Sequence, residues 1–165
     1  MNYSKVLLFL CWMLFTFSAC KENSNESALN TAEKKELVSK FIEMMEVKAF
    51  ERFGEIIADD YKQHNPMVKQ GLKGIQEGAS WFLNVFPDLS ASIDEVVVEG
   101  DLIVARITWT GTHSAELFGI PASGVKASWV GTDWWRVKDG KLIEHWDVVD
   151  WSGLINQLSK KNHDS

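Results

Sequence analysis

Residues 125–149, VKASWVGTDWWRVKDGKLIEHWDVV, contain the clearest fold signal in this 165-residue chain. The Asp139-Gly140 pair is a preferred dipeptide for a two-residue turn between antiparallel strands. The flanking residues are rich in Val, Ile, Thr and Trp, which favour strands. We therefore predict a β-hairpin with strands at 125–138 and 141–149.

The expected register of this hairpin singles out Asp133. A tight turn predicts four facing pairs: Val137 with Leu142, Trp135 with Glu144, Asp133 with Trp146, and Trp129 with Asp150. Facing residues share one side of a sheet, so Asp133 is expected on a face dominated by tryptophans. A carboxylate on such a face is costly unless it is hydrogen-bonded or protonated. Because desolvation favours the protonated form, Asp133 is a candidate general acid or base near neutral pH.

The opposite face of the hairpin is also mostly apolar. In the expected register it carries Val130, Trp134, Ile143, His145 and Val149. One face of an antiparallel sheet is usually in contact with water, so a second apolar face predicts a subunit interface and a homodimer. His145 is accordingly expected at that interface, although a one-residue bulge would move it to the Asp133 face.

The remaining residues predict helices followed by two more strands. Helices are expected at about 33–47, 50–57, 72–86 and 151–158, and strands at 92–99 and 102–113. Asn30 followed by Glu33 marks the start of the first helix. A turn at Gly100-Asp101 pairs Glu95 with Arg106 and Val97 with Val104. This order predicts an α+β fold, with helices on one face of a four-stranded antiparallel sheet.

The N-terminus is typical of a bacterial lipoprotein. Lys5 and the apolar run that follows it form a signal sequence at 1–19, too short to span a membrane comfortably. Phe17-Ser18-Ala19-Cys20 resembles a lipobox, which implies acylation of Cys20. Residues 20–30 then form a flexible tether, 31–158 the folded domain and 159–165 a disordered tail. We expect a lipid-anchored protein of the bacterial cell envelope, on the periplasmic side or the cell surface.

Composition excludes several classes of function. The chain has a net charge of −6 and a pI near 5.2. It lacks the basic footprint that nucleic-acid binding needs. Its only cysteines, Cys11 and Cys20, precede the domain, which excludes a disulfide framework there. Eight tryptophans provide either a bulky core or a cavity with aromatic walls, with Trp109 and Trp129 among the candidates.

Three histidines of the domain are candidate polar groups. His64 is either an acid/base at the mouth of a pocket or a loop cap that fixes Pro66. His113 ends a strand on the expected core face, where a structural role is the more common one. The spacing of His64, His113 and His145 lacks a short ligand pair, so no metal is expected. No nucleotide or dinucleotide motif is present, so no cofactor is expected either. The fourth histidine, His163, falls in the tail.

Several short motifs together suggest a family. In chain order they are Tyr61-x-x-His64-Asn65-Pro66, Pro87-Asp88-Leu89, Glu99-Gly100-Asp101, Gly111-Thr112-His113, Phe118-Gly119-Ile120-Pro121 and the run from Asp133 through Asp139-Gly140-Lys141 to His145-Trp146. Over about residues 33–158 the chain resembles the SnoaL-like polyketide cyclase (ester cyclase) family of the nuclear transport factor 2-like superfamily. The resemblance implies a cone-shaped α+β barrel with a deep pocket.

The same resemblance implies a cofactor-free intramolecular aldol condensation with Asp133 as the general acid/base. His64, His113 and Trp146 fall on family motif positions and are candidate pocket residues. Residues 119–124 read GIPASG where the family usually has GIPPTG, so a substrate does not carry over. We expect a cyclase- or isomerase-type enzyme for a small hydrophobic carbonyl compound. The alternative is a non-catalytic module that binds a small ligand or another envelope protein, because one fold can host unrelated tasks.

Overall fold

The structure is a computed structural model that describes residues 29–160. The predicted signal sequence, the lipidation site Cys20, most of the tether and His163 lie outside the described residues. Within them, no helix is long and apolar enough to cross a membrane.

The chain forms three α-helices, one 3-10 helix and five strands over residues 29–160. In order they are α1 (Thr31–Glu46), η1 (Phe50–Glu55), β1 (Ile57–Gln63), α2 (Gly71–Val85), β2 (Ser90–Glu99), β3 (Leu102–Thr112), β4 (Lys126–Lys138), β5 (Lys141–Val149) and α3 (Trp151–Lys160). The strands make one sheet in the order β1-β5-β4-β3-β2. The α+β prediction is confirmed, and the helices and last four strands fall within a few residues of their expected positions.

Strand β1 was not predicted and is the main correction to the fold. The prediction was a helix up to residue 57 and no regular element between it and the helix that starts near residue 72. Instead β1 adds a fifth strand, parallel to β5, with Gln63 beside His145. Its sequence, IADDYKQ, gave no clear period-2 signal because its exposed positions include two adjacent aspartates. This edge strand delivers Gln63 and Asn65 to the centre of the molecule.

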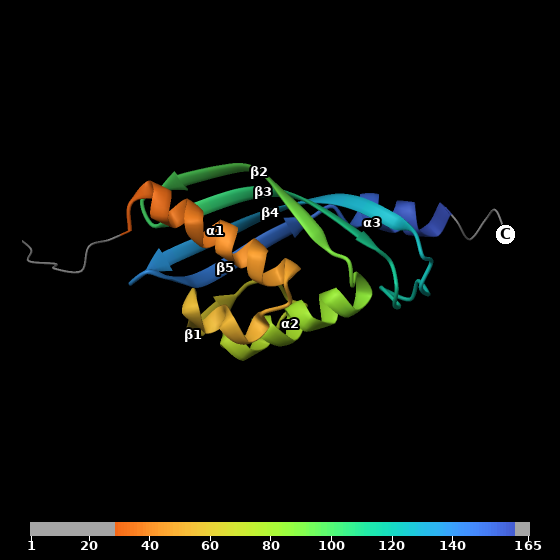
Figure 1. Cartoon of the computed structure of the whole chain (residues 1–165), viewed down its shortest axis with the longest axis horizontal. Helices are drawn as coiled ribbons and strands as arrows, with labels where there is room; N and C mark the ends of the chain where they lie inside the picture. Colours follow the sequence, from red (N-terminus) through yellow and green to blue (C-terminus); the bar gives the residue numbers. More distant parts are fainter. Residues whose placement is uncertain (1–28, 161–165) are drawn as a thin grey trace, which may run out of the picture.

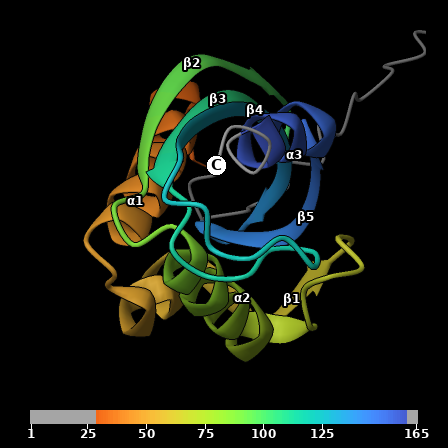
Figure 2. The same ribbon diagram turned by 90° about the vertical axis from the view of Figure 1, so that its right-hand side faces the viewer.

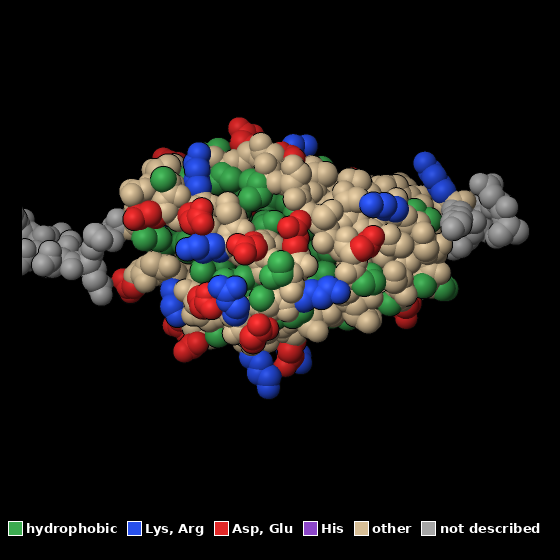
Figure 3. Space-filling view, in the orientation of Figure 1, with side chains coloured by type: hydrophobic (Ala, Val, Ile, Leu, Met, Phe, Trp, Pro, Cys, Tyr) green, Lys and Arg blue, Asp and Glu red, His purple; other side chains and the backbone are tan. Residues whose placement is uncertain are grey.

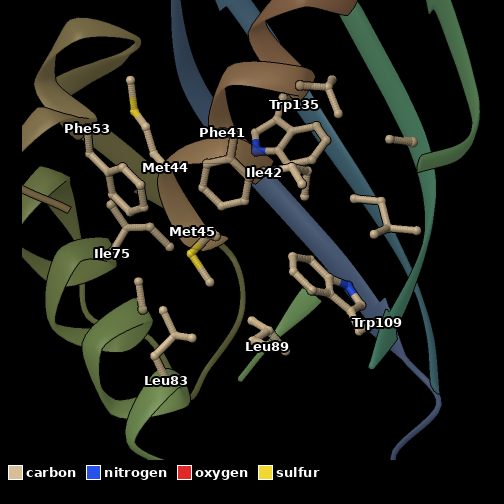
Figure 4. Packing of buried hydrophobic residues seen from close by; sticks show 14 of the residues in the cluster. Phe41, Ile42, Met44, Met45, Phe53, Ile75, Leu83, Leu89, Trp109 and Trp135 are labelled. Atoms are coloured by element: carbon tan, nitrogen blue, oxygen red, sulfur yellow. The ribbon is translucent and has the colours of Figure 1, made fainter. Parts of the chain in front are cut away.

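The sheet is strongly curved, and helices close its open side. Seen end-on in Figure 2, β2 to β5 arc around one side while α1 and α2 complete the ring. Figure 1 shows α1 and α2 against the inner face and α3 at the end of the sheet far from the start of α1. Rings from both layers meet in the core drawn in Figure 4, where Phe41 of α1 packs edge-on against Trp135 of β4 at 5.7 Å.

The β4–β5 hairpin forms at the expected turn but with a shifted register. Asp139 and Gly140 both have positive φ angles, 50° and 76°, as a type I′ turn requires. Val137 faces Leu142 as predicted, but Ile143 is an extra residue without a facing partner on β4. Beyond this bulge Trp135 faces His145 and Asp133 faces Asp147, so the predicted pairs with Glu144 and Trp146 are wrong.

The register shift exchanges side chains between the two faces of the sheet. His145 and Val149, expected on the outer face, instead line the interior. Trp146, expected beside Asp133, moves to the outer face as the facing partner of Trp134. The first hairpin follows the prediction, with Glu95 opposite Arg106 and Val97 opposite Val104.

Acidic and basic side chains are intermixed on the surface. In the view of Figure 3, Lys and Arg side chains alternate with Asp and Glu over the helices and the sheet edge. This face therefore has no basic patch of the kind that tracks a nucleic-acid backbone.

We predict that Asn30→Ala destabilises the fold by about 1 kcal/mol, because it removes a helix cap. The Asn30 side chain accepts the backbone N–H groups of Ala32 and Glu33, and Glu33 returns a bond to the Asn30 N–H. Chemical unfolding measures the loss. Asn30→Asp retains the acceptor oxygen and should remain close to wild type, whereas equal losses in both variants would contradict the capping role.

Candidate active site

A cavity of about 140 Å³ lies between the inner face of the sheet and α2. Its walls are largely aromatic and apolar, and they include Met67, Trp81, Phe82, Trp109, Trp129 and Trp151. Five polar side chains also line it: Gln63, Asn65, Asp133, His145 and Asp147. The exposed fractions of Met67 and Trp81 are 48% and 43%, so these two residues mark its mouth. An apolar cavity with a few convergent polar groups is the usual form of a small-molecule site.

Three of the six predicted site residues in the domain line this cavity. Asp133, Trp109 and Trp129 do so, and both tryptophans are almost fully buried. His64 and Trp146 lie together elsewhere, with their rings stacked 4.5 Å apart. His64 Nε2 also lies 2.9 Å from a carboxylate oxygen of Glu144. His64 and Trp146 are therefore not among the residues that line the cavity. The contacts of His64 match neither an acid/base at the cavity mouth nor a loop cap that fixes Pro66.

His113 is buried and holds a loop closed. Its Nδ1 accepts the backbone N–H of Ser123 at 3.2 Å, while its backbone N–H donates to Val125 and its carbonyl accepts from Gly124. Burial lowers the pKa of His113, which favours the neutral ring that these contacts need. His113 is not among the residues lining the cavity, and its contacts match the structural alternative.

His145 and Asp133 form the central polar contact of the cavity. His145 Nε2 lies 3.0 Å from Asp133 Oδ1. The imidazole is sandwiched between Trp135 at 5.3 Å and Tyr61 at 6.2 Å, with nearly parallel rings. The exposed fractions of the His145 and Asp133 side chains are only 8% and 14%. The pair is thus fixed in orientation and largely shielded from water.

Asp147 is the second carboxylate of the cavity, and it is poorly compensated. Asn65 Nδ2 donates to its Oδ2 at 2.9 Å, whereas its Oδ1 is buried and has no hydrogen-bond partner within residues 29–160. Burial raises the pKa of Asp147, the charge of His145 opposes that rise, and the neighbouring Asp133 adds to it. A buried carboxylate with a raised pKa and an unpaired oxygen is a candidate for proton exchange.

The Asn65 side chain fixes which oxygen of Asp147 is open. Asn65 Oδ1 accepts the backbone N–H of Met67, so its amide nitrogen must face Asp147. Oδ2 of Asp147 is therefore occupied by a donor, and Oδ1 is the atom that can gain or release a proton.

Gln63 and Asp147 were not predicted as site residues, and Asn65 appeared only within a family motif. His145 was expected on the outer face unless a one-residue bulge moved it to the Asp133 face, and the structure contains that bulge. His145 and Asp147 alternate with Trp146 along β5, so either set can face the cavity and only the bulge decides between them. Gln63 and Asn65 belong to the unpredicted strand and the turn after it. Within the described part of the chain, no group of three or more His, Cys, Asp or Glu side chains is placed to hold a metal ion.

Comparison with known proteins identifies the family. Residues 35–158 match the family described as SnoaL-like polyketide cyclase. The chain belongs to the SnoaL-like polyketide cyclase family. Its relatives include the aklanonic acid methyl ester cyclase DauD from Streptomyces sp. (strain C5), 26% identical over 76% of this chain and 81% of that protein. The nogalonic acid methyl ester cyclase from Streptomyces nogalater is 28% identical over 55% of this chain and 69% of the relative.

A solved structure supports the same assignment. TsrD from Streptomyces laurentii superposes with a TM-score of 0.75 and 32% identity, over 79% of this chain and 98% of TsrD. The predicted SnoaL-like fold is therefore confirmed. The relatives named as cyclases are consistent with a cyclase-type enzyme.

We predict that Asp147→Asn raises the melting temperature of this family member near pH 8, because the charged form of a desolvated carboxylate is removed. The folded-state pKa of Asp147 lies above its unfolded value, so its contribution is most favourable at low pH and is lost as the pH rises through the folded pKa. The advantage of the variant should hence grow from pH 4 to pH 8, by about 2–4 °C for each kcal/mol relieved.

Thermal melts at half-unit pH steps measure this difference. Asp59→Asn is the matched control, because it makes the same chemical change at an exposed position of β1. If Asp147→Asn melts lower than wild type by the same amount at every pH, Asp147 is a structural hydrogen-bond acceptor instead.

Proposed function

We propose that this protein is a cofactor-independent cyclase that catalyses an intramolecular aldol reaction on a small hydrophobic carbonyl compound. The observation that carries the proposal is Asp147, a buried carboxylate with a raised pKa and one open oxygen in an aromatic cavity. The family match and the relatives named as ester cyclases support the reaction class.

The proposed reaction is an isomerisation with a simple proton balance. Asp147 Oδ1 removes a proton from the carbon next to a carbonyl, and the C–H electron pair becomes an enolate. The enolate carbon attacks a second carbonyl of the same molecule, forming one C–C bond and leaving an alkoxide. A proton delivered to that oxygen completes the aldol product, so no atom is gained or lost overall.

Asp133 is the proposed source of that second proton. It was predicted from the sequence as the general acid/base, and it lines the same cavity as Asp147 from the neighbouring strand. Its contact with His145 can hold a proton between the two groups. We therefore divide the predicted role: Asp147 takes the carbon proton, and Asp133 with His145 protonates the oxygen.

The cavity limits the proposed substrate in size and charge. Its volume of about 140 Å³ is close to the roughly 150 Å³ of an engineered cavity that binds benzene, so one ring fits inside. A compound larger than one ring would extend through the mouth at Met67 and Trp81. No Lys or Arg lines the cavity, whereas two carboxylates do, which disfavours a free carboxylate substrate.

A proton-exchange experiment tests the proposed base without knowledge of the true substrate. We expect the protein to catalyse deuterium exchange at the α-carbons of 4-phenylbutan-2-one in D₂O, followed by ¹H NMR. Asp147→Asn should reduce that rate by about 10²–10⁴-fold, the usual contribution of a general base. Asp133→Asn should retain the exchange, because protonation of the product oxygen follows the step that is measured.

Aklanonic acid methyl ester serves as the cyclisation probe, on which both variants should lose turnover. Asp59→Asn is again the control expected to match wild type. Saturable binding of either probe without exchange or turnover would favour the alternative function, a ligand-binding module. Exchange that survives in Asp147→Asn would exclude Asp147 as the base.

We further propose a lipid-anchored location in the cell envelope. Support comes from the apolar run and the Phe17-Ser18-Ala19-Cys20 motif. The tether would then present the cavity to compounds outside the cytoplasm, with the membrane contacted through the acyl chains alone.

We also propose a homodimer formed through the outer face of the sheet. One apolar row, Val97–Val104–Trp134–Trp146, crosses four strands in direct register. Val97 at the β2 end of that row has 54% of its surface exposed. On β5, Val148 lies two residues after Trp146 and has 65% of its surface exposed. Continuous apolar surface of this kind favours association.

Trp134→Lys should convert this dimer to a monomer, because it places an unpaired charge at the centre of the row. Sedimentation equilibrium measures the mass of each form. Glu77→Lys on α2 is the control expected to leave the mass unchanged. A wild-type protein that remains monomeric at about 100 μM, which corresponds to an association weaker than about −5.5 kcal/mol, contradicts the proposal.

A further inference from the structure

Gln63 connects the backbone that follows β1 to the contact between His145 and Asp133. It is 4% exposed, and its Oε1 accepts the backbone N–H of Asn65 at 2.9 Å. The same oxygen lies 3.1 Å from His145 Nδ1. The Gln70 side chain holds Gln63 in place by bonding both its backbone N–H and its carbonyl.

The orientation of the Gln63 amide is fixed by the Asn65 contact. A backbone N–H can only donate, so the atom facing it must be the oxygen. Turning the amide over would set two donors against each other and leave the N–H of the half-buried Asn65 without its acceptor, which is unfavourable. Because the oxygen has no proton, His145 Nδ1 must carry one to make its own bond.

A protonated Nδ1 determines how many protons the contact between His145 Nε2 and Asp133 contains. With Nδ1 protonated, the contact between His145 Nε2 and Asp133 Oδ1 needs a single proton, located on either atom. The two forms are neutral imidazole with protonated Asp133, or imidazolium with ionised Asp133, and the pair has no net charge in both. The remaining titratable groups facing the ring are Tyr61 on β1, whose pKa burial raises, and Asp147 on β5.

We propose that Gln63 is a positioning residue that locks His145 in the state with a protonated Nδ1 and thereby stores one transferable proton between His145 and Asp133. The buried amide nitrogen of Gln63, which has no partner in the part of the chain that the structure describes, is a consequence of that lock. The use of the stored proton on a substrate oxygen rests on the proposed cyclase function. The protonated state of His145 Nδ1 does not rest on that function, because it is a property of the unliganded protein.

Long-range ¹H–¹⁵N NMR of the histidine rings tests the lock directly. In the wild-type protein the His145 Nδ1 should show the chemical shift of a protonated nitrogen at every pH from 5.5 to 8. His113, whose Nδ1 accepts a hydrogen bond, should show the opposite pattern and is the internal control. An unprotonated His145 Nδ1 in the wild type would overturn the proposal, whatever the variants do.

Two substitutions separate the hydrogen bond from packing. Gln63→Leu has a similar volume but no acceptor, so His145 should shift to the form protonated at Nε2, with Asp133 ionised. Gln63→Glu keeps an acceptor oxygen and should retain the protonated Nδ1. Retention of that proton in Gln63→Leu would show that Gln63 does not set the state of the ring.

Activity measurements then distinguish the two proposals. If both hold, Gln63→Leu should lower the turnover of aklanonic acid methyl ester at least tenfold, while α-proton exchange by Asp147 continues and Gln63→Glu regains part of the turnover. A confirmed NMR pattern in a wild-type protein that shows neither α-proton exchange nor turnover would contradict the cyclase function and leave the lock intact. Normal turnover in a Gln63→Leu variant that has lost the protonated Nδ1 would show that the stored proton is not used.

Discussion

One extra residue in the last hairpin controls the chemistry of the interior. Ile143 has no facing partner on β4, and from that point each residue of β5 faces β4 one position out of the register that a regular hairpin gives. Because side chains alternate between the faces of a sheet, the bulge turns His145 and Asp147 inward and Trp146 outward. Without it, the cavity would hold Asp133 beside tryptophan, and both partners that give this carboxylate a role would lie on the outside.

The second organising feature is the backbone that follows β1. Gln63 accepts the N–H of Asn65, and Asn65 in turn accepts the N–H of Met67. Each amide oxygen is thereby occupied by the main chain two residues later. Asn65 must then present a donor to Asp147, whereas Gln63 must present its acceptor to His145. A short polar turn thus sets proton positions on two side chains that are more than 80 residues away in the sequence.

Sequence reasoning reached the fold but only part of the site. Local signals were sufficient for the helix cap at Asn30 and the turn at Asp139-Gly140, since both depend on neighbouring residues. Side chains alternate regularly between the two faces of the sheet along β3 and β4. This alternation was enough to predict that Asp133, Trp109 and Trp129 lie on the inner face. The bulge has no comparable signature, because Ile143 is an ordinary strand residue. β1 itself becomes a strand only through its parallel pairing with β5, a long-range contact.

Two polar atoms of the cavity residues lie in positions where an apolar side chain would make the fold more stable. Asp147 Oδ1 and Gln63 Nε2 are both buried without a partner among residues 29–160. Each such atom costs about 1–3 kcal/mol, and an apolar side chain of similar size would remove the cost. Both atoms are by-products of contacts that orient a proton-carrying group: the Asn65 bond leaves Oδ1 open, and the His145 bond leaves Nε2 unpaired. Local destabilisation of this kind is typical of sites where geometry serves a reaction. Both residues line the cavity, so the two unpaired atoms belong to the walls of the space in which a substrate or ligand would be held.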